Sequence, residues 1–121
     1  MTDELKLQRL HEALAQAGHT HTVADVADAV KRGAMRWWDN GDGNIVTEIT
    51  EYPQLKAINY FLVFGELKHC LALEHEINPY AIEQGCSIAT ACGRPGWLRA
   101  AAPTGWKLHG FAYVKALTNG R

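Results

Sequence analysis

Hydrophobic positions recur every three or four residues at the amino-terminal end of the chain. Leu7, Leu10 and Leu14 follow this period, acidic residues stand in the first turn, and Gly18 ends the run. Apolar residues at such steps gather on one face of a helix. The pattern predicts an amphipathic helix within residues 1–18, whose leucine stripe must pack against another surface.

A second helix is predicted between residues 22 and 33. Thr22 suits an N-cap, and Asp25 stands three residues later, where a capping box needs an acidic side chain. Valines and alanines then repeat at helical spacing up to Gly33, a residue type that commonly ends helices.

From Ala34 the period becomes strand-like. Residues 34–38 and 44–52 flank a turn rich in Asn, Asp and Gly, and residues 55–64 form a longer β-branched and aromatic run. Alternating polarity around a Gly-rich turn is typical of an antiparallel hairpin. We expect three neighbouring strands, with 55–64 central in the sheet.

The rest of the chain alternates helix and strand. We expect a helix from about 67 to 84 that bends or restarts at Asn78-Pro79, then a strand at Cys86–Cys92. A short helix from Pro95 and a last strand at Trp106–Leu117 follow. This order predicts an α+β fold with a mixed sheet of about five strands, an antiparallel amino-terminal part being joined to a βαβ unit.

Composition narrows the possible classes of protein. The 121 residues, 47% of them hydrophobic, fit one domain, with residues 1–18 as an extra helix and residues 22–117 as the core. The charges are scattered and the formal net charge is −1, which argues against direct binding to nucleic acid or to a membrane. We expect synthesis in a cytosol, and reduced, mostly buried thiols at Cys70, Cys86 and Cys92.

The sequence predicts no metal site. His19 and His21 lack a third ligand at suitable spacing, and residues 39–44 lack the ligand spacing of a calcium loop. We interpret these segments as an exposed loop and a hairpin turn. His69 and His75 are six residues apart on one helix, do not share a face, and receive no chemical role.

Glycines and tryptophans near the carboxyl-terminal end carry a family resemblance. Gly85-Cys86-x-Ile88 leads into Gly93-Arg94-x-Gly96-Trp97 and then Gly105-Trp106. With the element order, this run resembles the GCN5-related N-acetyltransferase (GNAT) fold over roughly Thr22–Leu117. Val46-Thr47-Glu48-Ile49, Tyr52-Pro53 and the Gly-Arg-Pro-Gly-Trp run are more narrowly similar to small GNAT-like proteins of tailed bacteriophages, some of which are carried in virions.

The resemblance implies a coenzyme site that this chain keeps only in part. In active members a glycine-rich loop after the central strand holds the coenzyme A pyrophosphate on backbone N–H groups. The matching residues here are Gly65, Glu66 and Leu67, and Glu66 adds a negative charge. Ala101 stands where active members commonly have a tyrosine as general acid. The resemblance therefore implies a degenerate coenzyme A site and, in the leading hypothesis, no cofactor.

Glu48 is the candidate general base. It lies with Glu51 in the region from which such a base projects in GNAT enzymes, and burial could raise a carboxyl pKa toward neutrality there. A solvated sheet face is the alternative interpretation of both residues.

Two sets of apolar residues are candidates for contact with a partner. Leu7, Leu10 and Leu14 form the stripe of the extra helix, although this stripe could pack on the chain's own sheet. Trp37 and Trp38 are adjacent and must face opposite sides of a strand, so another protein could cover one of them.

These features support three hypotheses. In the leading one, a phage-encoded protein acts as a virion or assembly component through contacts with other phage structural proteins, in multiple copies of a symmetric assembly. It would be made in the host cytoplasm and carried in the virion. The alternative is an acetyl-CoA-dependent N-acetyltransferase of a host or phage target, with Glu48 as base and water as acid. The third is an anti-defence protein that binds a host factor.

A V-shaped gap would discriminate between the first two hypotheses. Coenzyme A needs such a gap in a GNAT enzyme, between the strand ending at Phe64 and the strand at Cys86–Cys92.

Overall fold

The computed structural model describes residues 2–93 and 95–117, which belong to two compact units, residues 1–91 and residues 92–121. The second unit holds helix α5 (Pro95–Ala101) and the short 3-10 helix η1 (Ala102–Thr104). No helix within the described ranges is long and apolar enough to cross a membrane. The single domain expected over residues 1–121 stays a prediction.

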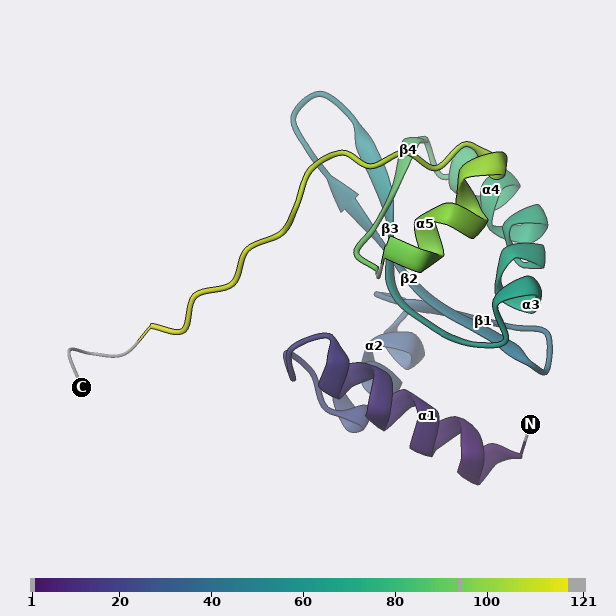
Figure 1. Cartoon of the computed structure of the whole chain (residues 1–121), viewed down its shortest axis with the longest axis vertical. Coiled ribbons are helices and arrows are strands. Elements are labelled where there is room, and N and C mark those ends of the chain that lie inside the picture. The colour runs from purple at the N-terminus through teal and green to yellow at the C-terminus, as the bar shows by residue number, and fades with distance from the viewer. Residues whose placement is uncertain (1, 94, 118–121) are drawn as a thin grey trace. The chain divides into compact units, whose positions relative to one another are not determined.

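The first unit contains a mixed sheet with two layers of helices (Figure 1). Its elements are α1 (Asp3–Gln16), α2 (Val23–Arg32), β1 (Arg36–Asp39), β2 (Gly43–Glu51), β3 (Lys56–Gly65), α3 (Leu67–Ala72), α4 (Glu74–Glu83) and β4 (Cys86–Ala91). The strand order is β1-β2-β3-β4, in which β1, β2 and β3 are antiparallel and β4 is parallel to β3. The predicted α+β class, the hairpin and the βαβ unit are confirmed.

The predicted capping box starts α2. The Thr22 side-chain oxygen accepts from the Asp25 N–H at 3.1 Å, and an Asp25 carboxylate oxygen accepts from the Thr22 N–H at 2.8 Å. Hydrogen bonding of the carboxylate to the Thr22 backbone N–H, and then to the Thr22 side chain, holds the pKa of the Asp25 carboxyl below its usual value. Gly33, in a left-handed conformation with φ of 80°, ends the helix as expected.

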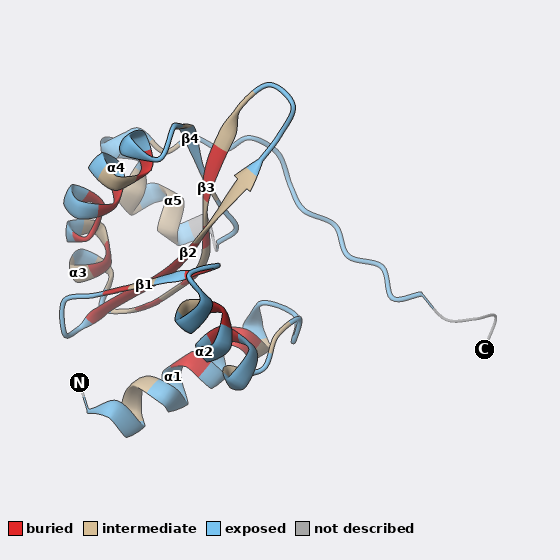
Figure 2. Cartoon of the chain, turned by 180° about the vertical axis from the view of Figure 1, so that it is seen from behind, coloured by how far each residue is buried: buried red, intermediate tan, exposed pale blue. Residues whose placement is uncertain are grey.

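The core lies on both faces of the sheet (Figure 2). Helices α1 and α2 cover one face, where a buried cluster contains Leu10, Leu14, Val26, Ala29, Met35, Val46, Leu62 and Phe64. Helices α3 and α4 cover the other face and bury Cys70, Leu73 and Ile77. Leu10 and Leu14 of the α1 stripe thus pack on the chain's own sheet, whereas Leu7 is half exposed.

The helix between β3 and β4 breaks at a different place from the one predicted. It is interrupted at Leu73, and Pro79 lies inside α4 without ending it. A proline leaves the carbonyl four residues earlier without its intrahelical donor. Here that residue is His75, which is exposed, so water can satisfy its carbonyl and the helix continues.

The predicted last strand is wrong. Residues 106–117 carry no helix or strand in the described chain, and the sheet has four strands instead of about five. Alternating apolar and polar residues indicate that a segment is suited to a sheet. A strand also needs an adjacent strand whose backbone groups hydrogen-bond with its own. No described strand pairs with this segment.

Replacing Gly65 with alanine should destabilise the fold more than the same change at Gly41. Both residues have left-handed backbones, with φ of +103° and +101°, so both variants should lose about 1–2 kcal/mol from backbone strain. A Cβ at residue 65 would also lie 2.1 Å from the Asp42 carbonyl oxygen, whereas one at residue 41 would meet nothing within 4 Å. Urea denaturation should show an additional loss of roughly 2 kcal/mol or more for Gly65→Ala. Equal losses would refute this close backbone approach.

Candidate functional site

The segment Gly65–Leu67, where the resemblance places a coenzyme loop, joins β3 to α3 and lies against the β1–β2 turn. The Glu66 N–H donates to the Asp42 carbonyl oxygen at 2.8 Å. The Asn40 side-chain amide donates to the His69 carbonyl at 2.8 Å, which ties the turn to α3 a second time. One N–H group of the expected phosphate loop is therefore already hydrogen-bonded within the protein.

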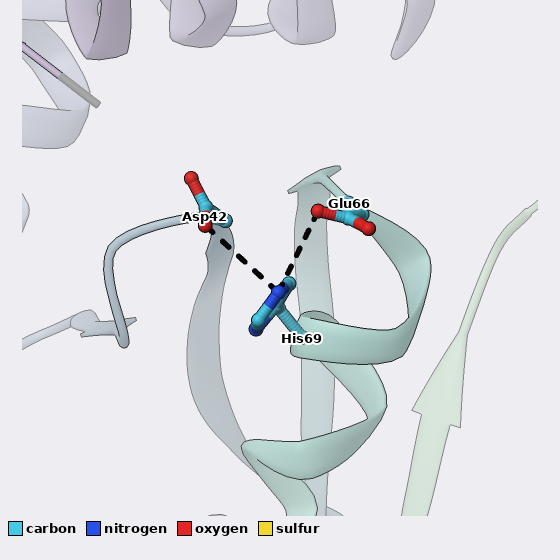
Figure 3. A group of neighbouring side chains, drawn as sticks. All are labelled: Asp42, Glu66 and His69. Atoms are coloured by element: carbon cyan, nitrogen blue, oxygen red, sulfur yellow. Dashed lines mark ion pairs between the residues drawn. The ribbon is translucent and has the colours of Figure 1, made fainter.

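Two carboxylates and a histidine meet beside this loop (Figure 3). His69 Nε2 lies 3.9 Å from an Asp42 carboxylate oxygen and 3.5 Å from a Glu66 carboxylate oxygen. Side chains of Asp42 and Glu66 are more than half exposed, and that of His69 is about one-third exposed. The amino end of α3 is thus lined by two acidic groups, and a protonated His69 would neutralise only one of them.

This cluster is the group among the described residues that could hold a metal ion. Its three ligand atoms lie within 4.8 Å of one another. An imidazole nitrogen and two carboxylate oxygens form a donor set that divalent transition metals accept. Ion pairing of His69 with both carboxylates accounts for the same arrangement without a metal.

The sequence indicates only part of this cluster. Glu66 is expected to repel an anion, whereas Asp42 is predicted as a turn residue and His69 has no predicted role. Asp42 and Glu66 become neighbours because β2 and β3 pair Gly43 with Gly65. No local sequence signal encodes that register.

Next to the cluster is an open hollow of about 360 Å³, lined by Leu5, Arg9, Asp42, Gly65 and Glu66. Arg9 from α1 brings a positive charge to its wall. The hollow therefore has mixed charge, with carboxylates on the side where the β3–α3 loop lies.

Glu48, the candidate base, belongs to a row of polar side chains across three strands. The Asn59 amide on β3 donates to the Glu48 carboxylate on β2 at 3.2 Å. The Thr90 hydroxyl on β4 donates to the Asn59 side-chain oxygen, Oδ1, at 2.9 Å. Glu48 follows Val46 by two residues, so it points to the face of the sheet that α1 and α2 cover. Its half-buried carboxylate is held in one orientation, whereas Glu51 is exposed at the strand end.

Pairing between β3 and β4 stops halfway along β3. Its last pair is Tyr60 with Ala91, so Phe61–Gly65 have no β4 partner among the described residues. Phe61 is also the extra residue of an irregularity in the β2–β3 register, where Val46 pairs with Leu62 and Thr47 with Tyr60. The two strands therefore cease to pair where the resemblance places the opening of a GNAT sheet.

Buried titratable groups on the opposite face do not form a nucleophilic site. Burial, with the nearby charge of Glu74, raises the pKa of the Tyr60 phenol, which therefore stays protonated at neutral pH. Burial also raises the pKa of the Cys70 thiol, and its Sγ donates to the Phe64 carbonyl at 3.3 Å. Cys70 is a core residue as predicted, but Cys92 is exposed, so the expectation that it is buried is wrong.

The candidate partner residues lie at different depths. Leu10 and Leu14 are buried in the core, and Trp38 is buried on the other face, where its indole N–H donates to Thr47 Oγ1 at 2.9 Å. Trp37 packs towards the α1–α2 face, as adjacent strand residues must, and is half-buried. Leu7, half exposed, and Trp37 line one hollow of about 350 Å³ with Asp3, Lys6 and Asp39.

Comparison with known proteins supports the fold and not a particular activity. No protein-family model and no curated protein matches the chain. An acetyltransferase of Trypanosoma brucei has a similar structure, with a TM-score of 0.64, 14% identity and 96% coverage of both chains. The wild-type TTHA1254 protein of Thermus thermophilus has a TM-score of 0.63 and 14% identity, over 99% of this chain and 96% of its own. Neither match points to a phage, and the chain shares the α+β fold of both proteins.

Proposed function

We propose that the chain is a protein-contact module built on the acetyltransferase fold, which acts in an assembly and not as a coenzyme A-dependent enzyme. The proposal rests on the hydrogen bonding and the charges at the amino end of α3. The Glu66 N–H is bonded to Asp42, and the carboxylates of Asp42 and Glu66 stand beside it.

Electrostatics gives the physical reason. A coenzyme A pyrophosphate is bound by free N–H groups and by the positive end of a helix. Like charges about 4 Å apart near a protein surface repel by roughly 4 kcal/mol at an effective dielectric constant of about 20. Two carboxylates at the expected position therefore oppose the ligand, and the six-residue α3 offers little to offset them. Ala101 in place of a general-acid tyrosine supports the same proposal.

The virion setting is the finer part of this proposal. It rests on the sequence similarity to small GNAT-like proteins of tailed phages, which includes proteins carried in virions. In that setting the partners would be other phage structural proteins, and the half-exposed Leu7 and Trp37 would be candidate contact residues. Co-purification with particles would support this setting, and absence from them would count against it.

N-acetyl transfer is the second candidate, which the geometry around Glu48 favours. The Glu48–Asn59–Thr90 row lies on β2, β3 and β4, close in sequence to the last β3–β4 pair. Glu48 would take a proton from the acceptor amine, whose nitrogen would attack the thioester carbonyl. The departing thiolate would take a proton from water.

Isothermal titration calorimetry with acetyl-CoA tests the main proposal. We expect no saturable heat at ligand concentrations up to about 1 mM, because the anion site is blocked and acidic. A parallel thermal-shift experiment should show no rise in melting temperature with ligand concentration. Micromolar binding, or a concentration-dependent shift, would refute a purely structural role.

A pair of variants tests the second candidate. If the protein acetylates an amine, Glu48→Gln should lower kcat by about 10²–10⁴-fold, the usual contribution of a general base. Glu51→Gln, a change on the same strand at an exposed position, should leave kcat within about twofold. Equal activity of the two variants would exclude Glu48 as the base.

A further inference from the structure

One imidazole and two carboxylates in the first unit are spaced as ligands of a single cation. His69 Nε2 lies 3.5 Å from a Glu66 carboxylate oxygen and 3.9 Å from an Asp42 carboxylate oxygen, and the three atoms lie within 4.8 Å of one another. Both distances exceed the roughly 2.7–3.2 Å of a hydrogen bond. Ion pairing explains why the groups are close, but it favours closure to a shorter, charge-assisted hydrogen bond. The spacing is therefore wider than ion pairing alone favours.

The spacing matches the coordination geometry of zinc. Zn–N and Zn–O bonds of about 2.0–2.2 Å at tetrahedral angles place neighbouring ligand atoms roughly 3.4 Å apart. The distance between His69 Nε2 and the Glu66 oxygen is close to this value. The Asp42 side chain is more than half exposed, so a small rotation can bring its oxygen to the same separation. Figure 3 shows the imidazole ring reaching toward both carboxylates.

The backbone that carries these ligands is held by contacts that do not use the ligand atoms. The Glu66 N–H donates to the Asp42 carbonyl at 2.8 Å, and the Asn40 side-chain amide donates to the His69 carbonyl at 2.8 Å. Gly43 lies so close to α3 that a Cβ there would be 2.6 Å from backbone atoms of His69. Ligands on segments that are already in position bind a metal more tightly, because less ordering accompanies binding.

The donor set and the local charge favour a divalent transition metal. Imidazole nitrogen suits zinc and its neighbours, whereas magnesium and calcium prefer oxygen ligands alone. Two carboxylates supply the charge that balances a divalent ion. Lys68 Nζ pairs with Glu66 Oε1 at 3.9 Å, which leaves Oε2, the oxygen nearer to His69, for a metal. Arg9 lines the adjacent hollow and is the other cationic group beside the carboxylates.

We propose that Asp42, Glu66 and His69 bind one zinc ion, which ties the β1–β2 turn to the start of α3. Three protein ligands leave at least one tetrahedral position for water. The sequence predicts no metal site, because Asp42 and Glu66 are 24 residues apart and become neighbours only through the pairing of β2 with β3.

The zinc site requires only these three side chains and does not depend on the proposed function. A bound zinc ion would offset the two carboxylate charges, but it would leave the Glu66 N–H bonded to Asp42. Binding of acetyl-CoA to the metal-free chain would refute the proposed function, whereas titration with zinc decides the metal site.

Calorimetry of the metal-free full chain with Zn²⁺ is the first test. We expect saturable binding of one ion per chain, and a melting temperature that rises with zinc concentration. Mg²⁺ should bind about tenfold more weakly or less, because it prefers oxygen ligands. Absence of saturable zinc binding up to about 1 mM would overturn the proposal.

Variants test whether these three side chains hold the ion. Asp42→Asn, Glu66→Gln and His69→Ala should each weaken zinc binding by about tenfold or more, since loss of even an outer partner of a metal ligand costs about 10–100-fold. His75→Ala, at an exposed histidine of α4, is the matched control and should leave the affinity within about twofold. Circular dichroism verifies the fold of each variant, and His69→Gln replaces His69→Ala if that variant does not fold. Unchanged affinity in any of the three ligand variants would contradict the site.

NMR of the histidine ring nitrogens identifies the bound imidazole directly. During a zinc titration of the ¹⁵N-labelled full chain, the Nε2 signal of His69 should shift in proportion to the ion bound. The ring signals of His75 should stay in place. Saturable shifts at another histidine, with His69 unchanged, would overturn the proposal.

Discussion

The first unit depends on a close approach of two backbone segments, the β1–β2 turn and the β3–α3 junction. Gly43 and Gly65 face each other in the sheet register, and a side chain at either position would clash with backbone atoms. The approach lets the Asp42 carbonyl accept from the Glu66 N–H. It also brings the Asp42 carboxylate to Glu66 and His69. This close approach holds the start of α3 against the β1–β2 turn. It also occupies the Glu66 N–H group, which would otherwise be available to a phosphate, and it places two carboxylates at the site.

The sequence predicts the elements of the first unit because their signals are local. The leucine period of α1, the Thr22–Asp25 capping box and the Gly-rich hairpin turn act within a few residues. The site depends on register, which is not local. Cross-strand pairing makes Asn59 a partner of Glu48 and Thr90 a partner of Asn59, and it brings Asp42 next to Glu66 in the same way. The prediction of a last strand is wrong because the pattern of residues 106–117 indicates only that the segment is suited to a sheet. It carries no information on whether another strand lies beside it.

The charged residues of the chain are divided unequally between its two units. All the acidic residues lie in the first unit, and the charged residues of the second unit are all basic. We propose that the carboxylates of Asp42 and Glu66 make a protein partner more favourable than an anionic coenzyme. The hydrogen-bonded Glu48–Asn59–Thr90 row is the reason that acetyl transfer is the second candidate.

The central claim is that the amino end of α3 does not accept a coenzyme pyrophosphate. The most direct measurement is a residue-resolved NMR titration of the ¹⁵N-labelled chain with acetyl-CoA. We expect the amide signals of Gly65, Glu66 and Leu67 to stay in place throughout the titration. Saturable shifts centred on these three amides would contradict it.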